Sequence, residues 1–390
     1  MKKKVLAVLL GTALAVSTFA GCGGSDAKTE EPAATDDAAK ETEAPAADDK
    51  AAEETEAPAK EAGDVKVGFA MKTNNGPYFI KLVETVEDLA KEKGWECTVL
   101  TANEDITKEA ENIETFITQG MDVIFLDSID PDACIPSIDA AADAGIPVIN
   151  LDSGVNGGKY VTTVYSNNKE NGRLSGIAYI DWMKEKGKED EEIISILLSG
   201  KKGNVAGQER RMGLFAGIVQ GRTGCTEEEA WKASQEIEDQ LTSGGKAEYP
   251  DAKFKIVGQG WGNWTEDDGL TAAEDFITAN PDVTTLLGEN DQMLFGGLTA
   301  LNNAGLKGVA LVAAADGAQA AFDMIKDNEN ADNPYVVSGL NSPVLVGQDG
   351  VRIAEEIING ASWDDYEQIT LTEAAGVTKD LVDKYYDVGF

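Results

Sequence analysis

The chain has 390 residues, with 70 acidic and 33 basic side chains, a net charge of −37 and no histidine. Such acidity makes nucleic acids and anionic membrane surfaces poor partners. The lack of histidine removes the commonest general base and nearly every zinc site, which disfavours most classes of hydrolase and metalloenzyme.

Residues 1–22 predict a secretory signal that ends in a lipobox. Lys2, Lys3 and Lys4 precede an apolar stretch over residues 5–19, and the small pair Ala20 and Gly21 precedes Cys22. The stretch is too short to span a bilayer with margin, so we interpret it as a processing segment. We expect Cys22 to become the lipidated first residue, so that the mature chain is extracytoplasmic and touches the cell membrane only through its lipid anchor.

Residues 23–63 predict a disordered acidic linker. From Ser25 to Gly63 there is no aromatic residue and no Val, Ile, Leu or Met. Such a composition cannot bury enough apolar surface to offset the entropy of ordering. The folded body therefore begins at Asp64, and it is long enough for two domains.

From Val65 onward, short apolar runs alternate with amphipathic stretches, which predicts an α/β fold with parallel sheets. The first set of apolar runs covers residues 65–71, 95–100, 122–127 and 147–152. A second set covers residues 191–199, 253–260, 284–290, 309–316 and 335–340, with helical patterns between them. Two such sets predict two Rossmann-like lobes, each wound on its own sheet.

Polar and aromatic side chains follow many of these runs. One Asp at a strand end is more often a helix cap, but the repetition of the same chemistry favours a binding site. Ligands of open α/β sheets bind outside the carboxyl ends of the strands. A sugar or polyol needs carboxylates and amides around its hydroxyls and aromatic planes against its apolar faces. The side chains predicted to bind such a ligand are Lys72, Asn75, Tyr78, Phe79, Asp152, Ser153, Arg210, Trp264, Asn290, Asp316 and Asn341.

From Val65 to about Leu371 the chain resembles the ribose-type, class I periplasmic sugar-binding proteins of ABC importers. KTNNGPYF resembles the turn after the first strand of that family, and VINLD resembles the strand that ends in the sugar-binding Asp, at Asp152. ERRMGL carries the Arg, two residues, Gly pattern at Arg210, and GNW places Trp264 where an aromatic ring stacks. GENDQM, AADG and GLNSP resemble the strand ends that carry Asn290, Asp316 and Asn341.

The resemblance implies a periplasmic-binding-protein type I fold with a three-strand hinge. Lobe 1 would comprise residues 64–166 plus 342–372, and lobe 2 residues 167–341 plus 373–390. It also implies a monomer without catalytic residues, cofactor or metal, which captures a monosaccharide or related polyol and delivers it to the membrane permease of an ABC importer.

The chain departs from the family pattern at three positions, two of which involve charge. Gly76 stands where the family often has Asn, Ser153 where it often has Arg, and Lys72 where it has a small hydroxyl. We hypothesise that Lys72 supplies the missing positive charge from the other side of the pocket. The alternative is that Lys72 points to solvent.

Other functions fit the sequence less well. The same lobes would serve a ligand receptor for a chemosensory or two-component system, which the sequence does not separate from transport. A glycosidase would need paired carboxylates, for which Asp152 and Asp316 are candidates. A repressor would need a helix-turn-helix, which residues 22–64 do not supply.

Some segments carry weaker signals. The glycines of residues 258–263 lack dinucleotide-loop spacing, and residues 327–332 lack the glycine and final Glu of a calcium loop. Residues 222–249 form a long stretch that either caps the cleft or serves as a docking surface. Cys97, Cys134 and Cys225 are an odd set, for which we expect packing roles and one disulfide at most.

Overall fold

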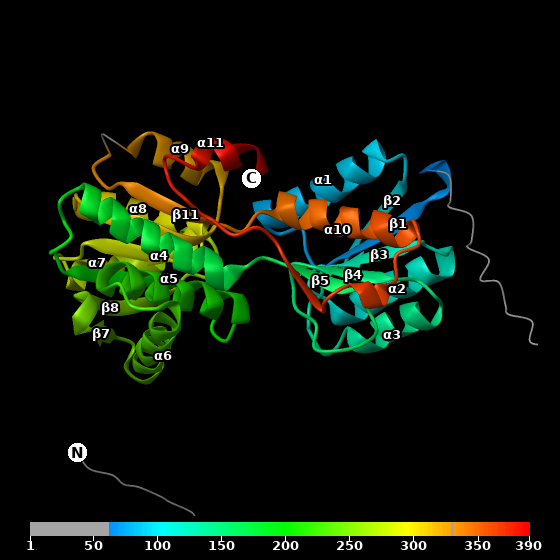
Figure 1. The fold of residues 1–390 in the computed structure, drawn as a ribbon, viewed down its shortest axis with the longest axis horizontal. Coiled ribbons are helices and arrows are strands. Elements are labelled where there is room, and N and C mark those ends of the chain that lie inside the picture. The colour runs from blue at the N-terminus through cyan, green and yellow to red at the C-terminus, as the bar shows by residue number, and fades with distance from the viewer. Residues whose placement is uncertain (1–61, 329–330) are drawn as a thin grey trace, which may run out of the picture. The chain divides into compact units, whose positions relative to one another are not determined.

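The computed structural model describes residues 62–328 and 331–390. The predicted signal, Cys22 and nearly all of the predicted linker lie outside the described residues. Within them, the strands form two separate sheets, each with its own helices (Figure 1). No helix of the described part of the chain is both long enough and apolar enough to cross a bilayer.

The first sheet has six strands in the order β12-β5-β4-β3-β1-β2, all paired in parallel. Its inner strands are short and buried on both faces, as the apolar runs predict. The strands are β1 (Lys66–Met71), β2 (Glu96–Thr101), β3 (Val123–Leu126), β4 (Val148–Leu151), β5 (Thr162–Tyr165) and β12 (Ile369–Leu371). The helices of this lobe are α1 (Pro77–Glu92), α2 (Ile106–Gln119), α3 (Ile135–Asp143) and α10 (Pro343–Ile358).

Helix α1 shows how local sequence sets the packing of this lobe. Pro77 occupies the first turn, where its missing N–H costs nothing, and Leu82, Val86 and Ala90 form the stripe that is buried on the sheet. Helix α10 lies beside α1 although it is far away in the chain, as the orange and blue ribbons show (Figure 1). The first lobe is therefore completed by a C-terminal helix.

The second sheet has seven strands in the order β13-β11-β10-β9-β6-β8-β7, parallel except for β13 and β7. The strands are β6 (Ile193–Ser199), β7 (Ala247–Tyr249), β8 (Phe254–Trp261), β9 (Thr285–Gly288), β10 (Ala310–Asp316), β11 (Tyr335–Leu340) and β13 (Gly376–Val377). The helices are α4 (Asn168–Glu185), α5 (Val205–Thr223), α6 (Glu227–Gly244), α7 (Glu266–Ala279), α8 (Asp291–Ala304), α9 (Gln319–Lys326) and α11 (Val382–Tyr385). Short 3-10 turns are η1 (Ala62–Asp64), η2 (Pro250–Ala252), η4 (Trp363–Asp365) and η5 (Tyr386–Val388).

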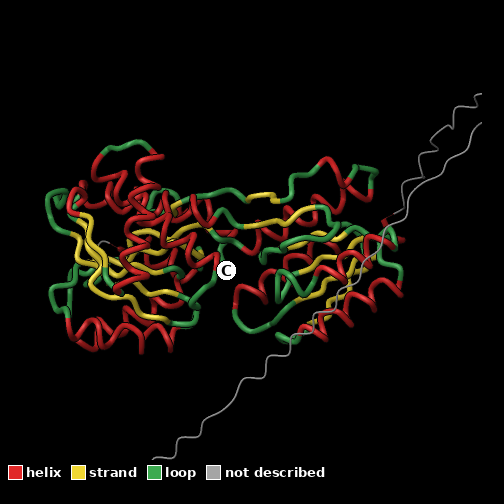
Figure 2. The backbone as a smooth tube through the Cα atoms, turned by 90° about the horizontal axis from the view of Figure 1, so that it is seen from below, coloured by secondary structure: helices red, strands yellow, loops and turns green. Residues whose placement is uncertain are grey.

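The predicted α/β class with two parallel sheets is confirmed, and Figure 2 shows the strands of each sheet in yellow with red helices around them. The predicted apolar runs coincide with β1 to β4, β6 and β8 to β11. Strands β5, β7, β12 and β13 were not predicted. The last three have only two or three residues, too few for a periodic pattern, and β5 begins with two threonines instead of an apolar run.

Three chain segments connect the two sheets, and hydrogen bonds tie them together. The Thr372 N–H donates to the Tyr165 carbonyl at 3.0 Å, which joins the first and third segments. The Asn171 amide donates to the Leu340 carbonyl at 2.7 Å and accepts from the Ala375 N–H at 3.0 Å. A single buried side chain therefore links the second segment to the third.

Residues 222–249 contain α6, which begins with a capping box between Thr226 and Glu229 and packs on α5. The Arg211 guanidinium joins Glu238 of this helix to Glu289, which follows β9. The stretch is thus an integral layer of the second lobe. Among the residues that the structure describes, Cys97, Cys134 and Cys225 form no disulfide.

Candidate functional site

A charged cluster lies at the carboxyl ends of β1, β3 and β4. Lys72 Nζ donates to Asp152 Oδ2 at 3.1 Å and to Ser153 Oγ at 2.6 Å. It also lies 3.1 Å from Oδ1 of Asp127, which is fully buried. These strands are neighbours in the sheet, so their ends meet where a ligand of an open α/β sheet binds.

Lys72 therefore turns inward and does not point to solvent, with 16% of its side chain exposed. Burial alone would lower the pKa of an ammonium group, but the charges of Asp127 and Asp152 outweigh burial and raise the pKa of Lys72. The side chain thus carries its charge at every physiological pH.

Two aromatic rings lie beside this cluster, at the start of α1. Lys72 Nζ is 4.7 Å from the centroid of the Phe79 ring, a cation–π contact. The Tyr78 ring packs edge-on against Phe79, with centroids 5.5 Å apart, and against Phe390 of the C-terminus, at 5.6 Å. The Tyr78 hydroxyl is buried beside the Asp152 carboxylate; burial raises the pKa of Tyr78, and the charge of Asp152 and a hydrogen bond to it add to the rise.

A second cluster lies at the strand ends of the other sheet and centres on Arg210. Its guanidinium donates to Asn168 Oδ1 at 2.8 Å and to Asp316 Oδ1 at 3.1 Å. The Asn341 amide also donates to Asp316 Oδ1, at 3.1 Å. Burial raises the pKa of Asp316, whereas Arg210 and Asn341 oppose that rise.

Trp264 and Asn290 complete this second cluster. The Arg210 guanidinium lies 5.4 Å from the Trp264 ring centroid, and the Asn290 amide donates to the Trp264 carbonyl at 3.3 Å. Trp264 has a φ of 68°, which is uncommon for a residue with a side chain. The indole packs on Gly200 and Gly207, where a Cβ atom would overlap the ring.

Asp291 is adjacent to Asn290, but its role is internal. Its fully buried carboxylate accepts from the backbone N–H groups of residues 316, 317 and 318 and from the hydroxyls of Tyr335 and Ser338. It therefore holds the turn that follows β10, and with it Asp316, in place.

The two clusters lie near each other, because the Tyr78 ring contacts Phe390, whose carbonyl accepts from the Gln319 N–H just after Asp316. The negative charge of Asp152 contributes to the raised pKa of both Tyr78 and Asp316, after burial, which is the larger cause for each. Arg210 of the second cluster opposes the rise at Tyr78 of the first. Within residues 62–328 and 331–390, the Oδ1 atom of Asn341 is buried without a partner. Unsatisfied buried polar atoms are costly, which suits a site that a polar ligand completes.

Asn75 does not join either cluster. It is exposed, and its backbone N–H donates to Thr73 Oγ1 at 3.2 Å. The other predicted contacts fall into the two clusters, with Lys72, Tyr78, Phe79, Asp152 and Ser153 in the first and Arg210, Trp264, Asn290, Asp316 and Asn341 in the second.

Sequence reasoning missed three residues at this place. Asp127 ends a predicted apolar run, so the rule used for Asp152 would have found it. The Tyr165 hydroxyl, at the end of β5, donates to Glu209 Oε2 of α5 at 3.2 Å and joins the two lobes. Burial raises the pKa of Tyr165, and the charges of Glu209 and Asp152 add to it. No sequence signal pairs Tyr165 with Glu209.

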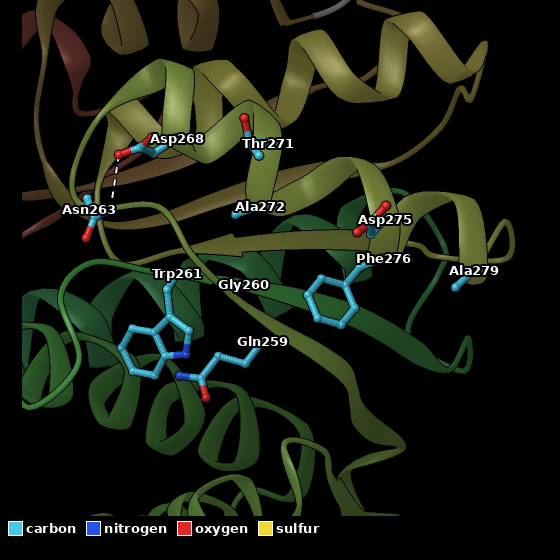
Figure 3. A pocket seen from close by; sticks show the side chains of 10 residues that line it. All are labelled: Gln259, Gly260, Trp261, Asn263, Asp268, Thr271, Ala272, Asp275, Phe276 and Ala279. Atoms are coloured by element: carbon cyan, nitrogen blue, oxygen red, sulfur yellow. Dashed lines mark hydrogen bonds between the residues drawn. The ribbon is translucent and has the colours of Figure 1, made fainter. Parts of the chain in front are cut away.

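A shallow pocket of about 570 Å³ lies elsewhere in the second lobe, between β8 and α7 (Figure 3). Its lining includes Trp261, Phe276 and Asp268, which accepts from the Asn263 amide at 3.1 Å. None of the predicted ligand contacts lines it. In the described residues, no cluster of acidic or cysteine side chains is arranged to hold a metal ion.

Comparison with known proteins establishes the family. A model of the periplasmic binding protein domain matches residues 67–362, about three quarters of the chain. The chain belongs to the periplasmic binding protein family. The predicted resemblance to ribose-type sugar-binding proteins is confirmed, because the ribose import binding protein of Bacillus subtilis is 26% identical over 294 residues. The match covers 75% of this chain and 82% of that protein.

Other periplasmic binding proteins match at similar levels. The D-apiose import binding protein of Actinobacillus succinogenes is 25% identical over 297 residues, which cover 76% of this chain and 83% of that protein. A solved structure of an ABC transporter solute-binding protein from Mycobacterium smegmatis, with bound glycerol, has a TM-score of 0.64 at 26% identity. It covers 84% of this chain and 97% of that chain.

Proposed function

We propose that this periplasmic binding protein captures a monosaccharide or related polyol between its two lobes and delivers it to the permease of an ABC importer. The observation that carries the proposal is the approach of two polar clusters, one from each sheet, beside the contact between Tyr78 and Phe390, with the buried Asn341 Oδ1 left without a partner among the described residues. The named relatives import ribose and D-apiose, which supports a small hydroxyl-rich ligand.

The groups are suited to an uncharged polyol. Asp152, Asp316 and Asn341 offer acceptors for ligand hydroxyls, and the Arg210 guanidinium supports the negative charge of Asp316. Tyr78, Phe79 and Trp264 offer aromatic surface for the apolar faces of a sugar ring. Hydrogen bonds to charged groups contribute about 1.5–3 kcal/mol each, so a few of them suffice for micromolar binding.

We also infer that the chain has no catalytic role and works as a monomer. The predicted lipid anchor at Cys22 would hold it at the outer face of the cell membrane, with residues 23–63 as a tether. The family acts outside the cytoplasm, which agrees with such an anchor.

A thermal-shift screen followed by calorimetry tests the proposal. The panel contains D-ribose, D-allose, D-apiose, L-arabinose, xylitol and myo-inositol. We expect at least one of them to raise the melting temperature, because a ligand that binds only the folded form stabilises it by mass action. A panel that leaves the melting temperature of the wild type unchanged would contradict the proposal.

The variant Asp316→Asn then tests the site. It should weaken binding of the tightest panel ligand by about 30-fold or more, because the ligand loses a charged hydrogen-bond acceptor and the buried Arg210 loses its counter-charge. The control is Asp282→Asn, an exposed acid of the same lobe, which should bind within about twofold of the wild type.

A further inference from the structure

Lys72 has no hydrogen-bond donor to spare for a ligand. An ammonium group carries three N–H donors, and three acceptors surround Nζ: Asp152 Oδ2 at 3.1 Å, Ser153 Oγ at 2.6 Å and Asp127 Oδ1 at 3.1 Å. The Phe79 ring covers a further side of the group. Its contacts are therefore within the first lobe.

Asp127 is the innermost member of this cluster. It follows β3, which lies between β1 and β4 in the sheet, and its side chain is fully buried. Its backbone N–H donates to the Ala70 carbonyl at 2.9 Å, and its Oδ1 atom accepts from Ser153 Oγ at 2.7 Å. Asp127, Ser153 and Lys72 thus contact one another in a closed triangle beneath the strand ends.

Asp152 is the outermost member. Its side chain is 21% exposed, against none for Asp127, and only its Oδ2 atom contacts Lys72. Its backbone has a φ of 65°, a left-handed conformation that costs energy in a residue with a side chain. Such a conformation persists only where neighbouring groups stabilise it, and the ion pair with Lys72 is one of these interactions.

We propose that Asp127 and Lys72 are positioning residues that orient the Asp152 carboxylate toward the ligand and do not contact the ligand themselves. The inference deepens the proposed function, on which it rests. The sequence predicted Lys72 as a ligand contact; in this proposal Lys72 instead orients Asp152, which contacts the ligand. Asp127 is the buried counter-charge that keeps the ammonium in place when the lobes are apart.

The test is a double-mutant cycle at pH 8 with the panel ligand that binds the wild type most tightly. Asp127→Asn keeps the volume of the side chain and should weaken binding by about 10-fold, and Asp152→Asn should weaken it by about 100-fold. If Asp127 acts through Asp152, the double variant should bind no more weakly than Asp152→Asn alone. Purely structural damage would instead add to the loss.

Two further variants complete the design. Asp143→Asn, an exposed acid at the end of α3 in the same lobe, should bind within about twofold of the wild type. Lys72→Met removes the other member of the pair and should weaken binding in the wild-type background but not in the Asp152→Asn background. This variant keeps the test valid if Asp127→Asn fails to fold.

The outcomes separate the two proposals. A wild type that binds no panel ligand contradicts the proposed function and, with it, the role of Asp127. Two results would overturn the positioning role alone, given a wild type that binds a panel ligand. In the first, Asp127→Asn and Lys72→Met bind as tightly as the wild type. In the second, their losses of affinity multiply with the loss caused by Asp152→Asn.

Discussion

The carboxyl of Asp127 shows how burial and ion pairing compete at a single residue. Burial disfavours the charged form, and the nearby charge of Asp152 acts in the same direction. Lys72 opposes both but is shared between the two carboxylates, so the pKa of Asp127 is raised from 3.8 to about 7. The acid therefore titrates in the neutral range, and it faces Lys72 that follows β1, Asp152 that follows β4 and the Ser153 hydroxyl.

The raised pKa of Asp127 predicts a pH dependence of stability. Between pH 4 and pH 7 the folded chain holds a proton on Asp127 that the unfolded chain releases, so this group lowers the free energy of unfolding as pH rises. This contribution should lower the free energy of unfolding by up to about 1.4 kcal/mol per pH unit and become independent of pH above about pH 8. It should be absent in Asp127→Asn. Urea unfolding of both proteins at several pH values measures the difference. Parallel curves would contradict the predicted titration.

At the scale of elements, the contact between α4 and α5 sets the position of Arg210. Glycines line this contact on both helices, so that their backbones approach closely: Gly172, Gly176, Gly213 and Gly217. The approach brings Asn168, at the start of α4, to 2.8 Å from Nε of Arg210 on α5. The Arg210 cluster of the second lobe thus depends on the packing of α4 against α5.

Gly217→Ala should therefore destabilise the protein. A Cβ atom at this position would overlap the carbonyl of Arg173, a backbone group that cannot move aside. We expect the free energy of unfolding in urea to fall by about 1–3 kcal/mol. Gly244→Ala, in α6, is the matched control, because its Cβ atom would meet open space. It should leave stability unchanged or raise it by up to about 1 kcal/mol, and equal losses in both variants would contradict the packing argument.

At the scale of the whole molecule, each polar cluster belongs to one lobe, and three chain segments connect the two sheets. The hydrogen bond between Tyr165 and Glu209 and the ring contact between Tyr78 and Phe390 join the lobes beside the site. A ligand that binds both clusters should favour the arrangement in which they are closest, because only that form makes all of its contacts.

Solution scattering tests this closure. Adding the tightest panel ligand should lower the radius of gyration of the wild type, and Asp282→Asn should respond in the same way. Asp316→Asn, at the same ligand concentration, should show a smaller change or none. A ligand that raises the melting temperature without altering the radius of gyration would contradict closure while leaving binding intact.

The sequence by itself determined the α/β class, the two sets of strands and most of the polar strand ends. Strands buried on both faces must be nearly continuous apolar runs, and parallel strands bring their carboxyl ends to one edge. Asp152, Asp316 and Asn341 follow such runs, so their grouping by lobe could be predicted. The very short edge strands carry no such pattern.

Only the tertiary structure decided how these polar residues divide their roles. Lys72 and Asn75 lie in the same polar turn, yet Lys72 turns inward to two carboxylates and Asn75 is exposed. Tyr165 and Glu209 meet because β5 and α5 approach across the lobes, a contact between distant segments. Side-chain direction at a strand end depends on the neighbouring strands and helices, and a linear pattern does not contain that information.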